Sequence, residues 1–136
     1  MKEKPYFCIM AQHNDIGAWG EEHACEYLQR QGYIIVDRDW HYGRSKRDID
    51  IVCKTPDLAT VVFVEVKTRE HEEITAPEDA VDLQKMAFLG RAADNYVHLY
   101  DVAEDLRFDI ITVIGRKDST DIKINHIEDA FNPLLI

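Results

Sequence analysis

Basic residues are scarce in this chain of 136 residues. Lysine and arginine together number 16, against 26 aspartates and glutamates, so the formal net charge is −10 at pH 7. Proteins that attract nucleic acid through their overall electrostatic field are usually basic. The composition therefore excludes that mode of binding, and any contact with phosphate groups must depend on a local cluster of cations.

Long hydrophobic runs and paired cysteines are missing as well. No apolar stretch approaches the roughly 20 residues that a membrane-spanning helix needs, and the segment 1–10 is too short for a signal peptide. We therefore expect a cytoplasmic protein with no membrane partner. The three cysteines, Cys8, Cys25 and Cys53, show no C-x-x-C spacing, which argues against a disulfide framework or a zinc site. They are expected to be small buried hydrophobic residues.

Length and composition favour a single globular domain. Hydrophobic residues make up 46% of the chain and charged residues 31%, and we find no internal repeat, low-complexity tract or interdomain linker. The domain is expected to span residues 14–136. Residues 1–13 precede the first helical pattern and are predicted to be a disordered extension.

Hydrophobic periodicity predicts two helices and five strands in the order α-β-β-β-α-β-β. The first helix is expected from residue 14 or 15 to 31, with Gly32 just past its end. The second is expected over 77–99, with Pro77 at its start. The strands are expected at 33–36, 48–53, 61–68, 107–114 and 121–127.

Each predicted helix has an inward-facing stripe that contains one charged residue. Small residues flank Glu21 in the first helix, which would let its carboxylate approach the body of the domain; a glutamate at the edge of the stripe that reaches water is an equally good interpretation. The stripe of the second helix is predicted to be Val81, Lys85, Phe88, Leu89, Ala92 and Tyr96. Lys85 is its charged member, and long lysines often extend from such positions to solvent.

The strand VVFVEVKT, residues 61–68, turns from apolar to charged along one face. Side chains alternate across a strand, so Glu65 and Lys67 share a face with Phe63. A surface ion pair at a strand end is the simplest interpretation. However, a hairpin between 48–53 and 61–68 would bring Asp50 beside Glu65 if the register allows it, with Asp50 and Val52 on one face of their strand.

Asp50, Glu65 and Lys67 together have the chemistry that metal-dependent phosphodiester hydrolysis needs. Mg²⁺ prefers oxygen ligands, and one or two carboxylates with the substrate phosphate are enough to bind it. The ion polarises a phosphoryl oxygen and lowers the pKa of a bound water. A lysine beside it can orient that water and offset developing negative charge.

The pattern D-x14-E-V-K on consecutive strands resembles the PD-(D/E)xK nuclease superfamily. This resemblance implies an α/β restriction-endonuclease-like fold, with an α-β-β-β-α-β core, a central mixed sheet flanked by helices and here an extra C-terminal strand. More narrowly, residues 15–132 are similar to the bacterial YraN-like family of uncharacterised proteins. The segments that carry this similarity are GAWGEEHACEYLQRQGYIIVDRDW, DIDIV, VFVEVKTR, RFDIITV and HIEDAF.

The resemblance assigns roles to four residues. It implies that Asp50 and Glu65 bind Mg²⁺ or Mn²⁺ and that Lys67 is the catalytic lysine. Glu21 matches the first-helix glutamate that completes the acidic, metal-binding site in archaeal Holliday junction resolvases of this fold. Ile49 replaces the usual proline before the aspartate, and Asp48 is a candidate alternate ligand. The resemblance also draws attention to Lys85, Arg107 and Asp109 without giving them a role.

These features predict a metal-dependent endonuclease that acts on DNA, including branched or flapped DNA. The alternative is a module on the same fold that binds nucleic acid or a protein without turnover. Phosphate contacts are expected from a basic loop, residues 38–47, and from the second helix, through Arg44, Lys46, Arg47 and Lys85. A solvated turn that happens to be basic is an equally good interpretation of that loop. The sequence leaves open whether the chain forms a homodimer.

Overall fold

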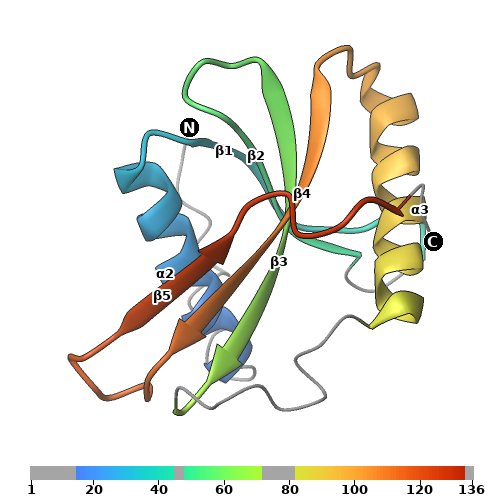
Figure 1. The fold of residues 1–136 in the computed structure, drawn as a ribbon. Helices are drawn as coiled ribbons and strands as arrows, with labels where there is room; N and C mark the ends of the chain where they lie inside the picture. Colours follow the sequence, from blue (N-terminus) through green and yellow to red (C-terminus); the bar gives the residue numbers. More distant parts are fainter. Residues whose placement is uncertain (1–14, 45–47, 72–81, 134–136) are drawn as a thin grey trace.

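A five-stranded sheet with a helix on each side makes up the structure (Figure 1). The computed structural model describes residues 15–44, 48–71 and 82–133. The elements are α2 (Asp15–Arg30), β1 (Ile34–Trp40), β2 (Ile49–Lys54), β3 (Thr60–Arg69), α3 (Leu83–Tyr100), β4 (Asp105–Ile114) and β5 (Lys123–Ile127). The strands lie in the order β1-β2-β3-β4-β5. Only β3 and β4 are parallel, so the sheet is mixed. The predicted fold and element order are confirmed.

Two hydrophobic cores lie on the two faces of the sheet. The residues of α2 pack with Ile51, Val64 and Ile111, whereas those of α3 pack with Phe63 and Phe108. The central strand β3 contributes to both cores, and Val61 to Val64 are all buried. This explains its continuous apolar sequence, which is typical of a strand covered on both faces. Within the described ranges no helix is long and apolar enough to cross a membrane.

The cysteines behave as small hydrophobic residues where the structure describes them. Cys25 and Cys53 are buried and form no disulfide. Burial raises the pKa of each thiol to about 12, so neither is a thiolate near neutral pH. This confirms the expectation for these two residues. Cys8, like the predicted extension 1–13, lies outside the described ranges.

The end of α2 matches the prediction, and the start of α3 differs from it. Gly32, with φ +95°, follows α2, and the Tyr33 amide donates to the Leu28 carbonyl at 2.9 Å, which closes the helix end. The helix α3 begins at Leu83, later than the predicted residue 77. Asp82 is its N-cap, and the Asp82 side chain accepts a hydrogen bond from the Lys85 amide at 3.1 Å. Pro77 lies outside the described ranges.

The buried face of α3 also differs from the prediction. Its buried residues are Met86, Leu89, Ala92, Ala93 and Tyr96. Leu89, Ala92 and Tyr96 were expected there, but Phe88 is 45% exposed and Lys85 lies at the surface. The predicted stripe was therefore rotated toward the side of the helix that carries Lys85 and Phe88. Val81 falls outside the described ranges.

The β2–β3 hairpin fixes the position of Asp50. Asp57 accepts hydrogen bonds from the Thr55 hydroxyl and the Ala59 amide in the turn. The pairing runs from Lys54 opposite Val61 to Ile51 opposite Val64, so Asp50 comes just before the first residue of β2 that pairs with β3. Ile51 packs on the α2 side, but Ile49 packs with Val52 on the α3 side. The predicted alternation, with Ile49 and Ile51 on one face, is wrong because the strand twists at Asp50.

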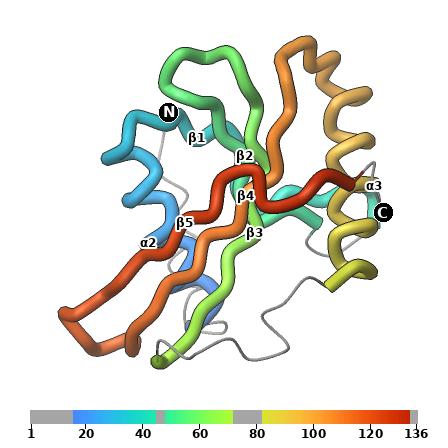
Figure 2. The backbone as a smooth tube through the Cα atoms, in the orientation of Figure 1, coloured from blue at the N-terminus to red at the C-terminus, as the bar shows by residue number. Residues whose placement is uncertain are grey.

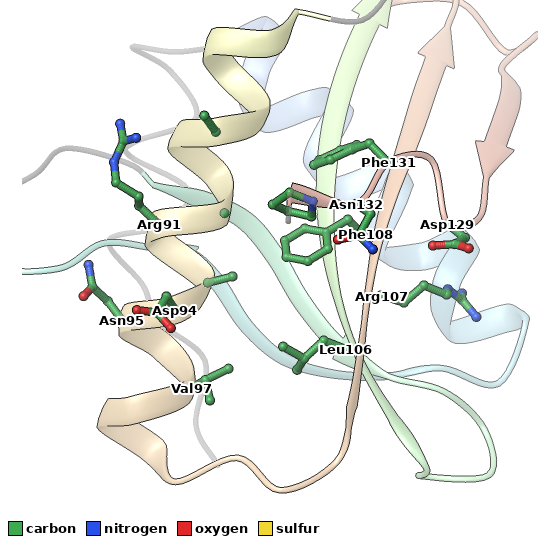
Figure 3. A pocket seen from close by; sticks show the side chains of 14 residues that line it. Arg91, Asp94, Asn95, Val97, Leu106, Arg107, Phe108, Asp129, Phe131 and Asn132 are labelled. Atoms are coloured by element: carbon green, nitrogen blue, oxygen red, sulfur yellow. The ribbon is translucent and has the colours of Figure 1, made fainter. Parts of the chain in front are cut away.

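The chain after β5 crosses to α3 and packs against it (Figure 2). Pro133 lies so close to Gly90 that a side chain at position 90 would collide with it. Phe131 packs against Phe108, with ring centroids 5.4 Å apart and ring planes tilted by 37°. A cavity of about 740 Å³ remains between α3, β4 and this segment, with Arg91 among its lining residues (Figure 3).

Candidate metal centre

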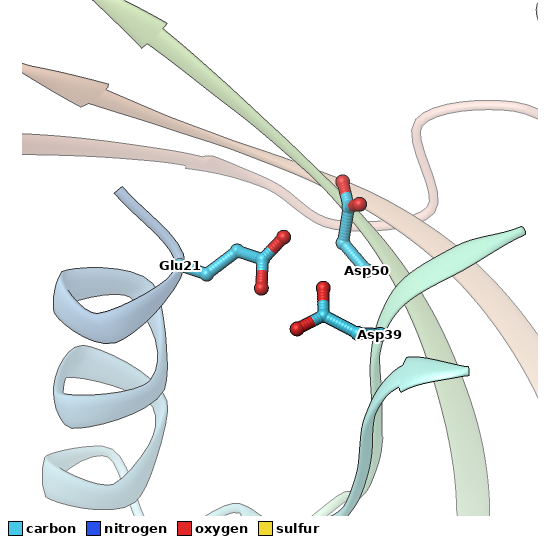
Figure 4. Close-up of side chains that lie close together, drawn as sticks. All are labelled: Glu21, Asp39 and Asp50. Carbon is cyan, nitrogen blue, oxygen red and sulfur yellow. The ribbon is translucent and has the colours of Figure 1, made fainter. Parts of the chain in front are cut away.

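Three carboxylates converge between α2 and the first two strands. Glu21 comes from α2, Asp39 from β1 and Asp50 from β2, and their side chains point toward one another (Figure 4). One oxygen from each lies within 4.8 Å of the others. We call these three residues the acidic group. In the part of the chain that the structure describes, no other group of three or more histidine, cysteine, aspartate or glutamate side chains lies this close together.

Glu21 reaches the acidic group because α2 packs closely on the sheet at that point. Gly20 touches Thr68 of β3 so tightly that a side chain at position 20 would overlap it. Glu21 itself is 3% exposed, and the expected small neighbours Gly20 and Ala24 are buried beside it. The expected inward orientation of Glu21 is thus confirmed. A glutamate buried to this extent is rare in proteins unless it is paired or functional.

Asp50 lies where β2 separates from β3. The Asp50 carboxylate accepts a hydrogen bond from the backbone amide of Val66 at 2.9 Å, which replaces the ladder hydrogen bonds beyond Ile51. The break in alternation at this residue explains how Asp50 joins Glu21 on the α2 side although its neighbour Val52 faces α3. The sequence predicted Asp50 as a ligand residue but gave no indication of this break.

Asp39 is the member of the group that the sequence did not predict. It has φ +51° within β1, a left-handed conformation in which aspartate is several-fold enriched among non-glycine residues. The hydrophobic pattern ended the strand at residue 36, so Asp39 was placed in a loop. The buried Trp40 that follows it was the available sign that the strand continues.

Glu65 and Lys67 line a pocket of about 170 Å³ on the α3 side of the sheet, together with Lys85. The Lys85 ammonium lies 2.6 Å from the Glu65 carboxylate. The hydrogen bond to Glu65 raises the pKa of Lys85, and the charge of Asp50 adds to that shift. Asp50 is therefore close enough to influence both sides of the sheet. Glu65 itself is not part of the acidic group.

Arg38 supplies positive charge next to the acidic group. It pairs with Glu22 at 3.1 Å. Burial alone would lower the pKa of Arg38, yet the pKa is raised, since the hydrogen bond with Glu22 and the charge of Glu21 favour the cation. Arg38, which the sequence placed in a basic loop, thus faces the carboxylates of α2.

The structure describes part of the predicted basic loop. Arg44 is exposed, whereas Lys46 and Arg47 lie outside the described ranges. Asp48, the candidate alternate ligand, accepts a hydrogen bond from the Tyr42 amide at 3.1 Å, and its own amide donates to the Trp40 carbonyl. Asp48 therefore forms hydrogen bonds at the base of the loop and is not part of the acidic group.

Arg107 and Asp109 form a separate buried network. Asp109 is fully buried and accepts four hydrogen bonds, two from Arg107, one from His126 and one from the Asp129 amide. Burial alone would raise the pKa of Asp109, but the hydrogen bonds from His126 and Arg107 lower it overall. The network joins β4 to β5 and to the segment after it, which indicates a structural role for this pair.

The acidic group fits a hard divalent cation. It offers three oxygen donors from three different elements and no nitrogen or sulfur donor, the ligand type that Mg²⁺ and Mn²⁺ prefer. Three carboxylates gathered without a cation repel one another, so a bound ion would remove an electrostatic cost. The structure therefore contains a possible metal-binding group formed by Glu21, Asp39 and Asp50.

Comparison with known proteins identifies similar chains. Residues 20–113 match the profile of the uncharacterised protein family UPF0102. A UPF0102 protein from Bacteroides thetaiotaomicron is 44% identical over 126 residues, which cover 93% of this chain and 99% of the relative. One from Porphyromonas gingivalis is 43% identical, over 93% of this chain and 90% of the relative. One from Flavobacterium psychrophilum is 40% identical, over 90% and 98% respectively.

Proposed function

This chain belongs to the uncharacterised protein family UPF0102, and from its site we propose that it is a metal-dependent endonuclease that hydrolyses phosphodiester bonds in DNA. The observation that carries the proposal is the convergence of Glu21, Asp39 and Asp50 at the point where β2 leaves β3. Glu65 and Lys67 lie on the same strand as Val66, whose amide binds Asp50. The acidic group on the α2 side and the pair Glu65 and Lys67 on the α3 side thus both lie near that point.

The residues of the chain have distinct roles in this proposal. Glu21, Asp39 and Asp50 hold the Mg²⁺ or Mn²⁺ ion, with Glu65 as a further ligand. When bound, the ion polarises a phosphoryl oxygen and acidifies a water. Lys67 orients the attacking water and offsets the charge that develops on the phosphate. Arg38 supplies positive charge beside the carboxylates.

The test is cleavage of a panel of duplex, forked, flapped and four-way-junction DNA with Mg²⁺ or Mn²⁺. We expect cleavage by the wild type and a loss of about a hundredfold or more in the Lys67→Ala variant, since a positioned charge at the reacting phosphate contributes on that scale. The matched control is Lys54→Ala, which removes a lysine from the neighbouring strand that pairs with Glu104.

Two outcomes would contradict the proposal. Equal cleavage by wild type and Lys67→Ala would point to a contaminating nuclease. A wild type that cleaves no member of the panel and binds neither ion in a calorimetric titration would exclude a metal-dependent nuclease. The Lys54→Ala variant should cleave like the wild type, because Lys54 lies at the opposite end of β2 from Asp50.

The ion pair between Lys85 and Glu65 leads to a second prediction. If Glu65 is a metal ligand, the Lys85 ammonium at 2.6 Å competes with the ion for its carboxylate. Replacing Lys85 by methionine should therefore tighten Mn²⁺ binding about two- to fivefold, a modest change because the side chain of Lys85 is 58% exposed. Isothermal titration calorimetry measures this directly. The control Lys54→Met breaks a similar lysine–glutamate pair, and an equal effect in both variants would remove Glu65 from the ligand set.

A module without catalytic turnover is the second candidate function. It is favoured by the formal charge of −10 and by the pairing of Glu65 with Lys85, which neutralises one of the proposed ligands. Under this alternative the chain would bind nucleic acid or a protein partner with no requirement for a metal. DNA binding that is unchanged by Mg²⁺, Mn²⁺ or EDTA, combined with an absence of cleavage, would support it.

A further inference from the structure

A groove of about 780 Å³ lies at the end of the sheet where β3 and β4 finish. Three segments line it: the first turns of α2 with Ile16 and Trp19, the end of β3 from Thr68 to Glu70, and the turn from Gly115 to Asp118. In Figure 1 these segments meet at the lower end of the sheet. Neither the acidic group nor the predicted basic loop contributes to the lining, so this is a separate surface.

The charge of the groove differs in sign from that of the whole chain. Its lining contains three cations, Arg69, Arg116 and Lys117, and two carboxylates, Glu70 and Asp118. The local sum is therefore +1, in a chain with a formal charge of −10. Because charges beyond about 8 Å are largely screened at physiological salt, a phosphate in the groove would respond mainly to these nearby cations.

Trp19 gives the groove an aromatic surface. Its ring is partly exposed, packs on the core beneath α2 and meets the His23 ring edge-on at 4.9 Å between centroids. This support holds the indole in place while part of it faces the groove. Proteins that bind single-stranded nucleic acid commonly place an aromatic ring beside arginine and lysine. A base stacks on the ring, and the phosphates contact the cations.

The groove adjoins the acidic group through short stretches of chain. Trp19 precedes Glu21 by two residues on α2, and Gly20 between them touches Thr68 of the groove. On β3, Thr68 follows by two residues the Val66 amide that binds Asp50, which is about 7 Å along a strand. The groove and the acidic group are therefore neighbours on α2 and β3, on either side of the contact between Gly20 and Thr68.

We propose that this groove binds single-stranded DNA, with a base against Trp19 and the adjoining phosphates against Arg69, Arg116 and Lys117. The inference rests on the proposed nuclease function, which supplies the DNA strand. It narrows the substrate of that nuclease to DNA that carries an unpaired stretch, such as a flap or fork. A fully paired duplex offers no free base to Trp19.

The test measures binding without cleavage, using the full-length chain in EDTA and an oligothymidine of about 12 nucleotides. The chain has two tryptophans, and Trp40 is 8% exposed, so quenching of tryptophan emission should come from Trp19. Trp40→Phe should retain the quenching. Trp19→Leu should lose it and weaken binding of a labelled oligonucleotide about tenfold, whereas Trp19→Phe, which keeps an aromatic ring on the core, should bind with intermediate affinity.

The cations are tested by the salt dependence of the same binding. The double variant Arg116→Ala/Lys117→Ala should lower the slope of log affinity against log salt by about 1.4, two single-strand phosphate contacts of about 0.7 each. The control Arg30→Ala/Arg91→Ala removes the same charge from exposed positions outside the groove. Thermal unfolding of the two double variants should match the wild type, because all four positions are exposed.

The outcomes separate this inference from the nuclease proposal. Because the binding test is run in EDTA, it does not depend on whether the acidic group holds a metal ion or supports cleavage. Absence of Trp19 quenching would contradict the proposal that the groove binds single-stranded DNA, whether or not the protein cleaves DNA. Equal salt slopes in the two double variants would contradict it as well. Equal binding and quenching by a glutamate-rich peptide would also overturn it and indicate an acidic protein segment as the occupant.

Discussion

Replacing Asp50 by asparagine is expected to abolish cleavage while making the folded protein more stable. The substitution removes one negative charge from the acidic group, in which the three carboxylate oxygens lie within 4.8 Å of one another. An amide is a weaker ligand for Mg²⁺ than a carboxylate, so we expect cleavage to fall at least a hundredfold, on the order of 10². The carbonyl oxygen of the introduced asparagine can still accept the hydrogen bond from the Val66 amide that Asp50 accepts at 2.9 Å.

The gain in stability follows from the same geometry. Like charges about 5 Å apart cost up to a few kcal/mol at an effective dielectric constant near 20, and the neighbouring Arg38 and Lys85 offset part of that cost. We therefore expect the free energy of unfolding in EDTA to rise by about 1 kcal/mol in Asp50→Asn. Such a trade-off, in which a substitution raises folding stability and removes activity, is common for residues of a functional site.

Metal should reverse the order of stability. A ligand at about ten times its dissociation constant adds about 1.4 kcal/mol to the stability of a protein that binds it, so Mg²⁺ should raise the free energy of unfolding of the wild type and leave that of Asp50→Asn unchanged. Urea unfolding with and without Mg²⁺ measures both effects. The control Asp105→Asn, at the exposed start of β4, should behave as the wild type. A destabilised Asp50→Asn that still responds to Mg²⁺ would refute the assignment.

The sequence was sufficient for the fold because the strongest patterns coincide with buried elements. The apolar run from Val61 to Val64 is covered on both faces of the sheet, and Gly32 ends α2 with a positive φ. The errors lie at α3. The sequence pattern predicted a start at Pro77, whereas the backbone shows that Asp82 is the N-cap. The predicted inward stripe also included Lys85 and Phe88, whereas the buried residues of α3 are Met86, Leu89, Ala92, Ala93 and Tyr96.

The candidate site was predicted in part for a related reason. Glu21 drew attention because small residues flank it, Asp50 because a hairpin would bring it beside Glu65, and the resemblance to the nuclease superfamily assigned both a ligand role. Asp39 joins them through a left-handed residue in β1 and a twist in β2 at Asp50, and neither feature has a periodic signature. Whether Glu65 faces Asp50 or Lys85 depends on that twist as well. Local backbone irregularities at the end of strand pairing therefore decide the composition of the site.

The largest loss of stability is expected from Asp109→Asn. Asp109 is fully buried and accepts hydrogen bonds from Arg107, His126 and the Asp129 amide. Asparagine has the same shape, but its amino group cannot accept any of these bonds, and Arg107 loses its buried counter-charge. Breaking a buried pair by removing one partner costs about 3 kcal/mol or more, which corresponds to roughly 10 °C in unfolding temperature for a domain of this size.

The pH dependence identifies the charge of Asp109 as the cause. Its pKa is below the ordinary value of 3.8, so the stabilisation is fully present above about pH 4 and is lost as the pH falls through the lowered value. Wild type and Asp109→Asn should therefore differ most at neutral pH and converge in acid, whereas wild type and the control Asp105→Asn should agree at every pH. Urea unfolding at several pH values gives these differences. A constant gap between wild type and Asp109→Asn down to the lowest pH would mean that the loss comes from packing, because a carboxylate that no longer carries a charge cannot stabilise Arg107.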